Sequence, residues 1–173
     1  MQYLPPMNFK KWIDDNRDKL KPPVGNKCVY TEANDFIVMV VGGPNARKDF
    51  HYNEGEEFFY QIEGDINLRI IEDGTPVDIP IREGEIFLLP RKVPHSPQRP
   101  ANTVGLVIER MRAPDQKDGC MWFCESCNEK LYDEYFHIEA PKDIVAKLKG
   151  VMQKFSSSAD LRKCNHCGAV MAL

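Results

Sequence analysis

The chain of 173 residues is long enough for one well-packed domain with a small appendage, but too short for two full domains. Hydrophobic residues make up 42% of it and charged residues 28%, which is ordinary for a soluble globular protein. The formal net charge is −3 and the basic residues are scattered, so we expect neither nucleic acid nor an anionic membrane as a partner. The longest apolar run, residues 36–41, is too short to span a bilayer.

The first residues predict a cytoplasmic protein that begins with a short helix. The stretch MQYLPPMNFKKW has two prolines and then charges where a secretory signal would need an apolar core. Asn8 can cap a helix in which Phe9, Trp12 and Ile13 share one face. This helix should end by Lys21, because two prolines follow.

Residues 28–111 show the pattern of a mainly β fold. Short runs of β-branched or aromatic residues alternate with turns rich in glycine, aspartate and proline. Many short strands separated by turns are typical of a sandwich or a barrel. The predicted strands cover residues 36–41, 57–62, 66–71, 77–81, 86–89 and 104–108.

The remainder of the chain predicts a separate C-terminal segment. We interpret residues 112–120, RAPDQKDGC, as a linker, and we divide the chain into residues 1–115 and 116–173. A helix is predicted over residues 143–155, after Pro141. Its apolar stripe is interpreted as core packing, and it consists of Ile144, Leu148, Met152 and Phe155.

Two histidines occur at characteristic spacings from glycine and proline residues, and this pattern predicts a shared metal site. His51 is expected on a loop, with Glu57 at the start of the strand that follows and Gly64 beyond it. His95 follows Gly84 and a proline, and a returning strand could bring it beside the other two. A single histidine on a loop is more often solvated or hydrogen-bonded, and Glu57 could belong to a charged strand rim. The pairing of the two patterns is what favours a metal.

Together the two patterns resemble the two motifs of the cupin superfamily, which implies a double-stranded β-helix, or jelly-roll barrel. The first motif usually has a second histidine where this chain has Asn53, and the second has asparagine where this chain has Arg99. His51, Glu57 and His95 are then two imidazoles and one carboxylate, the set that suits non-haem iron(II) oxygenases. Three protein ligands leave open positions for a chelating substrate and oxygen, and a three-histidine thiol dioxygenase is disfavoured.

Several distinctive blocks in order resemble the 3-hydroxyanthranilate 3,4-dioxygenase family in its short microbial form. The resemblance implies cleavage of the 3-hydroxyanthranilate ring with both atoms of O2, giving 2-amino-3-carboxymuconate semialdehyde. That product closes to quinolinate, the precursor of the nicotinamide ring of NAD. The family also suggests a homodimer. The blocks are LKPPVGN (20–26), VGGPNARKDFH (41–51), EEFFYQIEG (56–64), FLLP (87–90), PHSPQR (94–99) and VIER (107–110).

By this resemblance, His51, Glu57 and His95 bind the catalytic iron(II), and the substrate site comprises Glu57, Arg47, Arg99 and Glu109. Arginine forms two parallel hydrogen bonds with a carboxylate, so Arg47 and Arg99 suit the carboxylate of the substrate. Glu109 could accept a hydrogen bond from the amine or take the hydroxyl proton. Without the resemblance, each of these would more often be a surface charge or a structural ion pair.

Four of the six cysteines form two C-x-x-C pairs that predict a second metal site. Two such turns can supply four thiolates to one tetrahedral ion, either zinc or a single rubredoxin-like iron. The full ligand set leaves no room for a substrate, so we expect a structural role. We interpret Cys28 and Cys120 as packing residues and His166 as a bystander. The predicted ligands are Cys124, Cys127, Cys164 and Cys167.

Two other functions remain open at this level. A different cupin enzyme, such as a catechol dioxygenase or a sugar isomerase, would share the metal set but not the pattern of Arg47, Arg99 and Glu109. A metal-binding regulatory module would use the cysteine segment to contact partners. Oxygen uptake with an aminophenol would exclude a pure binding module.

Overall fold

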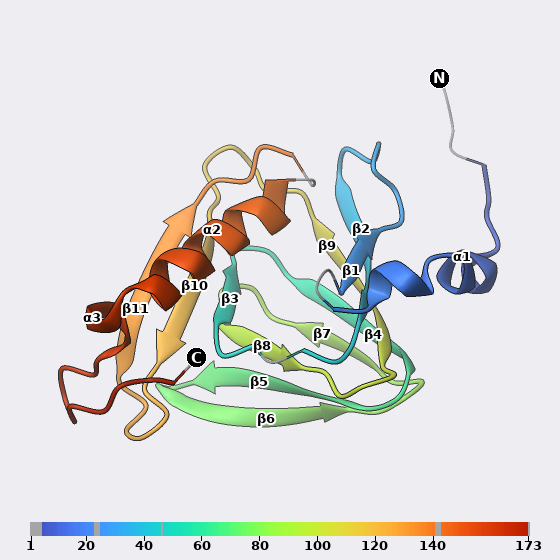
Figure 1. Ribbon diagram of the computed structural model, residues 1–173. Helices are drawn as coiled ribbons and strands as arrows, with labels where there is room; N and C mark the ends of the chain where they lie inside the picture. The colour runs from blue at the N-terminus through green and yellow to red at the C-terminus, as the bar shows by residue number, and fades with distance from the viewer. Residues whose placement is uncertain (1–4, 23–24, 46, 141–142, 173) are drawn as a thin grey trace.

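The computed structural model describes residues 5–22, 25–45, 47–140 and 143–172, and most of these residues form two β-sheets (Figure 1). The mainly β fold with a helix near each end confirms the expected architecture. The helices are α1 (Phe9–Asp15), the 3-10 turn η1 (Arg17–Leu20), α2 (Asp143–Ser157) and α3 (Ala159–Arg162). The strands are β1 (Asn26–Cys28), β2 (Phe36–Gly42), β3 (Phe50–Asn53), β4 (Glu57–Glu63), β5 (Ile66–Glu72), β6 (Thr75–Ile81), β7 (Ile86–Leu89), β8 (His95–Gln98), β9 (Val104–Arg110), β10 (Asp118–Phe123) and β11 (Lys130–Phe136).

The two sheets face each other as the walls of a barrel. One has the order β1-β2-β9-β4-β7 and the other β11-β10-β3-β8-β5-β6, and every pairing is antiparallel. Along β4 the buried residues alternate with less buried ones, as expected when one face of a sheet meets a core. The barrel core combines residues of both sheets, among them Phe59, Leu68 and Val107.

The N-terminal helix covers part of the outer face of the five-stranded sheet. The side chain of Asn8 accepts a hydrogen bond from the backbone N–H of Lys11 at 2.9 Å, which confirms the predicted cap. The α-helix ends at Asp15, and the 3-10 turn η1 then continues to Leu20. Ile13 and Leu20 pack on outward residues of the sheet, so this helix closes one end of that face.

The C-terminal segment is built onto the barrel through β10. Its strand pairs with β3 on one side and with β11 on the other, so the six-stranded sheet continues into the segment. Helix α2 lies across β10 and β11 (Figure 1), and Phe155 stacks on Trp122 with 4.2 Å between the ring centroids. The predicted apolar stripe of this helix is therefore core packing, as expected. Pro141 lies outside the described residues.

The predicted linker is wrong over its last three residues. Residues 118–120 are the first part of β10, and both faces of that strand are buried against its neighbours. The sequence RAPDQKDGC reads as polar, but the charge of Asp118 is matched inside the fold by Arg112. Among the described residues, no helix is long and apolar enough to cross a membrane.

Candidate active site and four-cysteine site

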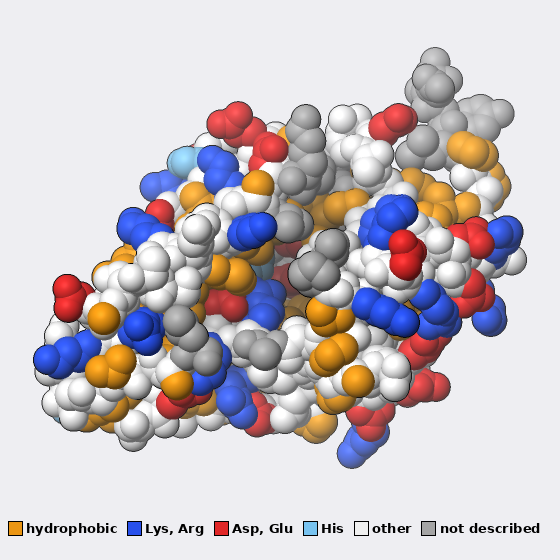
Figure 2. Space-filling view, in the orientation of Figure 1, with side chains coloured by type: hydrophobic (Ala, Val, Ile, Leu, Met, Phe, Trp, Pro, Cys, Tyr) orange, Lys and Arg blue, Asp and Glu red, His pale blue; other side chains and the backbone are white. Residues whose placement is uncertain are grey.

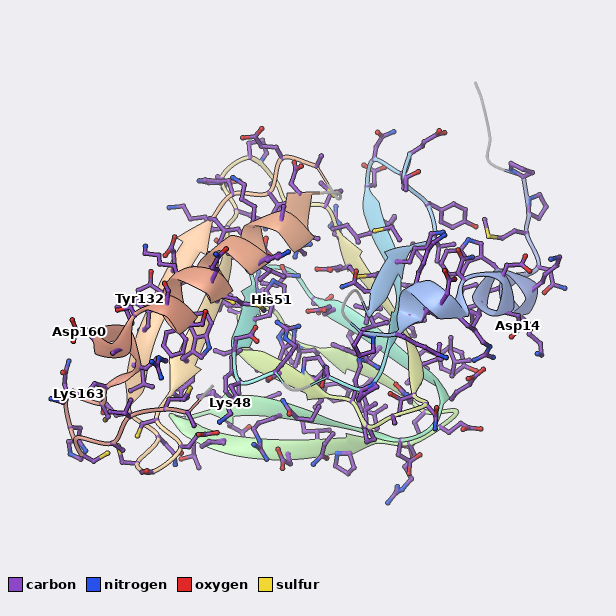
Figure 3. All side chains as sticks on the ribbon, in the orientation of Figure 1. Asp14, Lys48, His51, Tyr132, Asp160 and Lys163 are labelled. Carbon is purple, nitrogen blue, oxygen red and sulfur yellow. The ribbon has the colours of Figure 1, made fainter. Side chains whose placement is uncertain are left out.

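The strands bring His51, Glu57 and His95 together inside the barrel. His51 lies on β3 and not on a loop as predicted, because residues 50–53 pair with β10 and His51 itself also pairs with β8. His51 and His95 are direct partners across β3 and β8, while Glu57 begins β4 in the facing sheet. One potential ligand atom from each residue lies within 4.8 Å of the others, and all three side chains are buried. Figure 3 labels His51 on its strand.

The donor atoms of this set suit a metal ion. Nε2 of His95 lies 2.9 Å from Oε2 of Glu57, yet that oxygen is buried without a hydrogen bond from any described residue. A buried carboxylate oxygen without a donor costs free energy unless an ion compensates it. Burial raises the pKa of Glu57, but the facing His95 lowers it more, to about 2. Glu57 is therefore a carboxylate, and the set of two imidazoles and one carboxylate fits iron(II).

Arg99 is a buried guanidinium without a carboxylate partner among the described residues. Its Nη1 donates to Oε1 of Gln61 at 3.3 Å, while its Nε has no acceptor. Burial lowers the pKa of Arg99 to about 10, and the nearby charge of Arg47 acts in the same direction. The absence of a Cβ at Gly105 leaves the space in which this guanidinium lies. Such a cation is ready to bind an anionic group.

Arg47 is in a different electrostatic state. Its guanidinium forms a two-pronged contact with the buried carboxylate of Asp49, in which Nε donates to Oδ1 at 3.1 Å. Burial opposes the charge of Arg47, but Asp49 raises the pKa above its ordinary value. Arg47 also lines a cavity of about 410 Å³ between the barrel and the C-terminal segment. Acidic and basic side chains gather in a hollow near the middle of the face shown in Figure 2.

Glu109 lies directly across from Glu57 on the paired strands β9 and β4. Burial raises the pKa of Glu109, and the charge of Glu57 raises it further, to about 8. Asn53, at the position of the second cupin histidine, turns to Glu109 and donates from Nδ2 to Oε2 at 2.8 Å. Arg112 approaches the same oxygen at 2.6 Å. A carboxyl group with this pKa can exchange a proton near neutral pH.

Sequence reasoning did not find Arg112 and Asp118. Both lie in the segment that we interpreted as a linker, and no short motif marks them. Asp118 accepts a hydrogen bond from Nε2 of His51 at 2.7 Å, and Arg112 donates from Nε to Oδ2 of Asp118 at 2.7 Å. A buried carboxylate near a metal-site histidine is recognisable only once the strands are paired.

The four cysteines converge on one point at the end of the C-terminal segment. Their Sγ atoms lie within 4.8 Å of one another, with 3.6 Å between Cys124 and Cys167 and the same between Cys127 and Cys164. Zinc–sulfur bonds of about 2.3 Å place sulfurs roughly 3.8 Å apart at the corners of a tetrahedron. The spacing therefore fits a tetrahedral four-sulfur ion.

Two equivalent turns present these sulfurs. In the first, the N–H of Asn128 donates to the carbonyl of Cys124 at 2.9 Å, and in the second Gly168 donates to Cys164 at 2.9 Å. Both Asn128 and Gly168 adopt positive φ, as a tight knuckle requires. Backbone N–H groups that point at the sulfur lower the pKa of Cys124 to about 6. The thiolate form that binds metal is thus favoured at Cys124.

The fold and these two sites define a metal-binding β-barrel of the cupin type that carries a four-cysteine segment. Comparison with known proteins identifies the family. The family model described as 3-hydroxyanthranilic acid dioxygenase matches residues 1–156. A 3-hydroxyanthranilate 3,4-dioxygenase of Xanthomonas campestris is 53% identical over 96% of this chain and 92% of its own length. One of Neurospora crassa is 44% identical over 95% and 89%.

A solved cupin-2 domain protein of Shewanella frigidimarina covers 60% of this chain and 93% of its own, with a TM-score of 0.48 and 20% identity. The family model and the curated relatives both span most of the sequence. The chain belongs to the 3-hydroxyanthranilic acid dioxygenase family.

Proposed function

We propose that this protein is an iron(II)-dependent ring-cleaving dioxygenase that converts 3-hydroxyanthranilate and O2 to 2-amino-3-carboxymuconate semialdehyde, which leads to quinolinate. The observation that carries this proposal is the buried guanidinium of Arg99, which forms no ion pair with a carboxylate of the described residues and whose Nε has no acceptor. It lies in the same barrel as a two-histidine, one-carboxylate ligand set. The family membership supports the same activity.

The substrate carboxylate is proposed to pair with Arg99. A charge-assisted, two-pronged contact is among the stronger hydrogen-bonded interactions available in a dry site. Arg47 is the secondary anchor, because Asp49 already neutralises much of its charge. The carboxylate then fixes the ring, so that the neighbouring hydroxyl and amine face His51, Glu57 and His95.

The proton of the substrate hydroxyl is assigned to Glu109. When bound by the three ligands, iron(II) supplies a chelation point and the activation of O2, so that both oxygen atoms enter the product. Glu109 has a pKa of about 8, and its ionised form can accept the proton as the hydroxyl ionises and return it later. Asn53 and Arg112 hold the carboxyl group of Glu109 in place during this exchange.

The four-cysteine site is proposed to hold a structural iron or zinc ion. Four sulfurs complete a tetrahedron and leave no open position for a substrate. Thiolate ligands need a reducing compartment, which supports a cytoplasmic location for the protein. Residues 116–173 are proposed to act as the segment that this ion stabilises.

We also propose a homodimer in which a second copy of this chain covers the outer face of the five-stranded sheet. Phe36, Ile86 and Leu88 are exposed to 50%, 66% and 53% on this face. They lie on β2 and β7, on the part of the sheet that helix α1 leaves open, and Phe58 and Ile108 lie between them. Contiguous apolar surface of this kind marks protein interfaces.

Oxygen consumption by the iron-loaded protein tests the proposed function. The purified protein is loaded with iron(II) without air, and O2 and 3-hydroxyanthranilate are then added. We expect one O2 consumed for each substrate, together with the absorbance of the semialdehyde. Catechol, which lacks both the amine and the carboxylate, is the control substrate and should react far more slowly. Equal rates with catechol, or no oxygen uptake with 3-hydroxyanthranilate, would contradict the proposal.

A further inference from the structure

We infer that Asp118 and Arg112 are positioning residues that join the metal-ligand histidine His51 to Glu109 through one buried hydrogen-bonded chain. The inference rests on the proposed function for the roles of His51 and Glu109. It concerns two residues that touch neither the proposed substrate anchor nor the other two members of the metal set.

The chain of contacts runs through four buried side chains. Nε2 of His51 lies 2.7 Å from Oδ1 of Asp118, and Oδ2 of Asp118 accepts from Nε of Arg112 at 2.7 Å. Nη2 of Arg112 contacts the same Asp118 and also approaches Oε2 of Glu109 at 2.6 Å. The side chains of Asp118, Arg112 and Glu109 are exposed to 0%, 2% and 2%. A single guanidinium thus bridges the two carboxylates.

The strand register explains why these residues meet. Asp118 pairs with Asn53 across β10 and β3, two positions along from His51, so its side chain reaches His51 diagonally on the inner face. Arg112 follows β9, three residues after Glu109, and its Nη1 also donates to the carbonyl of Arg110 at 3.1 Å. The guanidinium is therefore fixed at three points. Because the guanidinium is held in place, the carboxylates of Asp118 and Glu109 that contact it are held in place as well.

The contact with His51 has a defined chemical consequence. A carboxylate can only accept, so Nε2 of His51, which faces Asp118, carries the proton, and only Nδ1 of the same ring is left to bind the metal. A hydrogen bond of this kind fixes the tautomer and ring orientation of a metal-ligand histidine and increases its basicity. Asp118 would otherwise be a buried charge with a high desolvation cost, and Arg112 offsets that charge. This arrangement supports the orientation of His51 without adding a fourth ligand.

A stabilising role alone does not account for this pair. Buried ion pairs contribute little or nothing to folding relative to apolar side chains of the same size. The same two-pronged geometry occurs on the surface between Arg69 and Asp78, where Nε donates to Oδ1 at 2.7 Å and Nη2 to Oδ2 at 2.9 Å. The surface pair contacts no site residue, whereas the buried pair contacts two. Asp78 therefore provides a matched control.

The first test is the affinity of the catalytic site for iron(II), measured without air and without substrate by competition with a chelator. Iron bound by Glu57→Ala reports the four-cysteine site alone and is subtracted. We expect Asp118→Asn to weaken binding at the catalytic site by about 10-fold to 100-fold. Asp78→Asn should bind iron(II) as the unmodified protein does. Unchanged affinity in Asp118→Asn would overturn the inference.

The second test measures whether a change at Asp118 alters the contribution of Glu109 to substrate binding. The dissociation constant of 3-hydroxyanthranilate is measured without O2 on iron-saturated protein for Asp118→Asn, Glu109→Gln and the double variant. If Arg112 joins the two residues, the double variant should depart at least about threefold from the product of the single effects. Multiplicative effects would show that the two residues act independently and would overturn the joining role.

Arg112→Lys provides the same tests if Asp118→Asn does not fold. Lysine keeps the charge but loses the fork that holds both carboxylates. We expect at least about a tenfold loss of iron(II) affinity, since a supporting contact to a metal ligand is removed. Unchanged affinity in this variant would also overturn the inference. The iron measurement needs no turnover, so a failure of the unmodified protein to bind or oxidise 3-hydroxyanthranilate would contradict the proposed function alone.

Discussion

Two arginines near the metal set differ in whether their charge is already compensated. Arg47 contacts the carboxylate of Asp49 with two nitrogens, whereas Arg99 meets only the amide oxygen of Gln61. Burying a charge without an ion-pair partner costs free energy, and an anion bound to Arg99 would offset this cost. The resemblance assigned both arginines to the substrate. Their surroundings make Arg99 the stronger candidate for the substrate carboxylate.

Replacement of Arg99 by alanine should weaken the use of 3-hydroxyanthranilate. A hydrogen bond to a charged group contributes roughly 1.5–3 kcal/mol, so kcat/KM should fall at least about tenfold. For 2-aminophenol, which has no carboxylate, the same substitution should matter much less. Specificity constants for both substrates in both proteins isolate the carboxylate contact. Equal losses on the two substrates would mean that Arg99 serves the iron site or the fold, and that the anchor is Arg47.

Replacement of Glu57 by alanine should abolish catalytic iron binding while the protein stays folded. The substitution removes a ligand and the charge that offsets the ion, so turnover should fall by more than the roughly 10-fold to 100-fold typical of residues that only support a ligand. The exposed neighbour Glu56 is the control, and Glu56→Ala should keep both iron and activity. Metal analysis and oxygen uptake make the comparison. Near-normal turnover of Glu57→Ala with iron(II) would refute the assignment of the ligands.

The sequence predicted the candidate ligand set better than the residues that contact it. His51, Glu57 and His95 occur at spacings that a reader can recognise, and the structure brings the three together. Asp118 lies 67 positions from His51, and its contact depends on the pairing of β3 with β10. Side-chain partners this far apart leave no local pattern. The pairing that joins them follows only from the assembled sheet.

At the scale of elements, the predicted strands lie close to their observed bounds, but the sequence did not predict β1, β3, β8, β10 and β11. Apolar runs such as β2, β4 and β9 were found because they are rich in β-branched and aromatic residues and are bounded by turn residues. The short strands β3 and β8 contain histidine, asparagine, proline and glutamine, which look like loop residues. Their inner faces hold the site, so polar function replaced the apolar signal. The sequence pattern therefore missed β3 and β8, although it found β4 and β9, which carry Glu57 and Glu109.

Strand β9 offers a test of how backbone shape supports the site. A Cβ at Gly105 would lie 2.8 Å from Nη1 of Arg99 and 2.8 Å from Oε1 of Gln61. The guanidinium is the flexible end of a side chain, so Gly105→Ala should displace it and leave the barrel folded. We expect KM for 3-hydroxyanthranilate to rise about tenfold, because roughly one charge-assisted hydrogen bond is lost.

The control for this strand is a glycine in open space. Gly150 lies on the exposed side of α2 with no atom within 4 Å of an added Cβ. Gly150→Ala should stabilise the protein by up to about 1 kcal/mol through helix propensity and leave KM unchanged. Thermal unfolding and steady-state kinetics on both variants separate the two effects. An unchanged KM in Gly105→Ala would mean that the position of Arg99 does not matter for substrate binding.

At the scale of the whole molecule, the open face of the five-stranded sheet predicts self-association. Leu88→Arg places a charge on this face, where a second copy would have to bury it without a partner. We expect the unmodified protein to sediment as a dimer and Leu88→Arg to sediment as a monomer at micromolar concentration. Lys10→Glu on helix α1, away from the open face, should remain dimeric. A monomeric unmodified protein would contradict the proposed interface.

The C-terminal segment connects its own metal site to the barrel through one sheet, which makes the two sites structurally linked but chemically separate. Cys127→Ser removes one of four sulfurs, and binding energy at such sites is folding energy. The metal content of the four-cysteine site should therefore fall. The unfolding midpoint should drop by at least about 5 °C, since 1 kcal/mol corresponds to roughly 2–4 °C in a chain of this size. Catalytic iron should remain, because His51, Glu57 and His95 all lie in the barrel.

Activity per folded molecule distinguishes a structural segment from one that takes part in turnover. His166→Ala is the matched control, because the exposed side chain of His166 lies between Cys164 and Cys167 but is not one of the four ligands. This variant should keep the metal of the four-cysteine site. Metal analysis, thermal unfolding and oxygen uptake are measured on both variants. In Cys127→Ser, β10 still pairs with β3 and holds Asp118 near His51, so some activity should persist. A stable fold with complete loss of chemistry would instead place the four-cysteine site in the reaction.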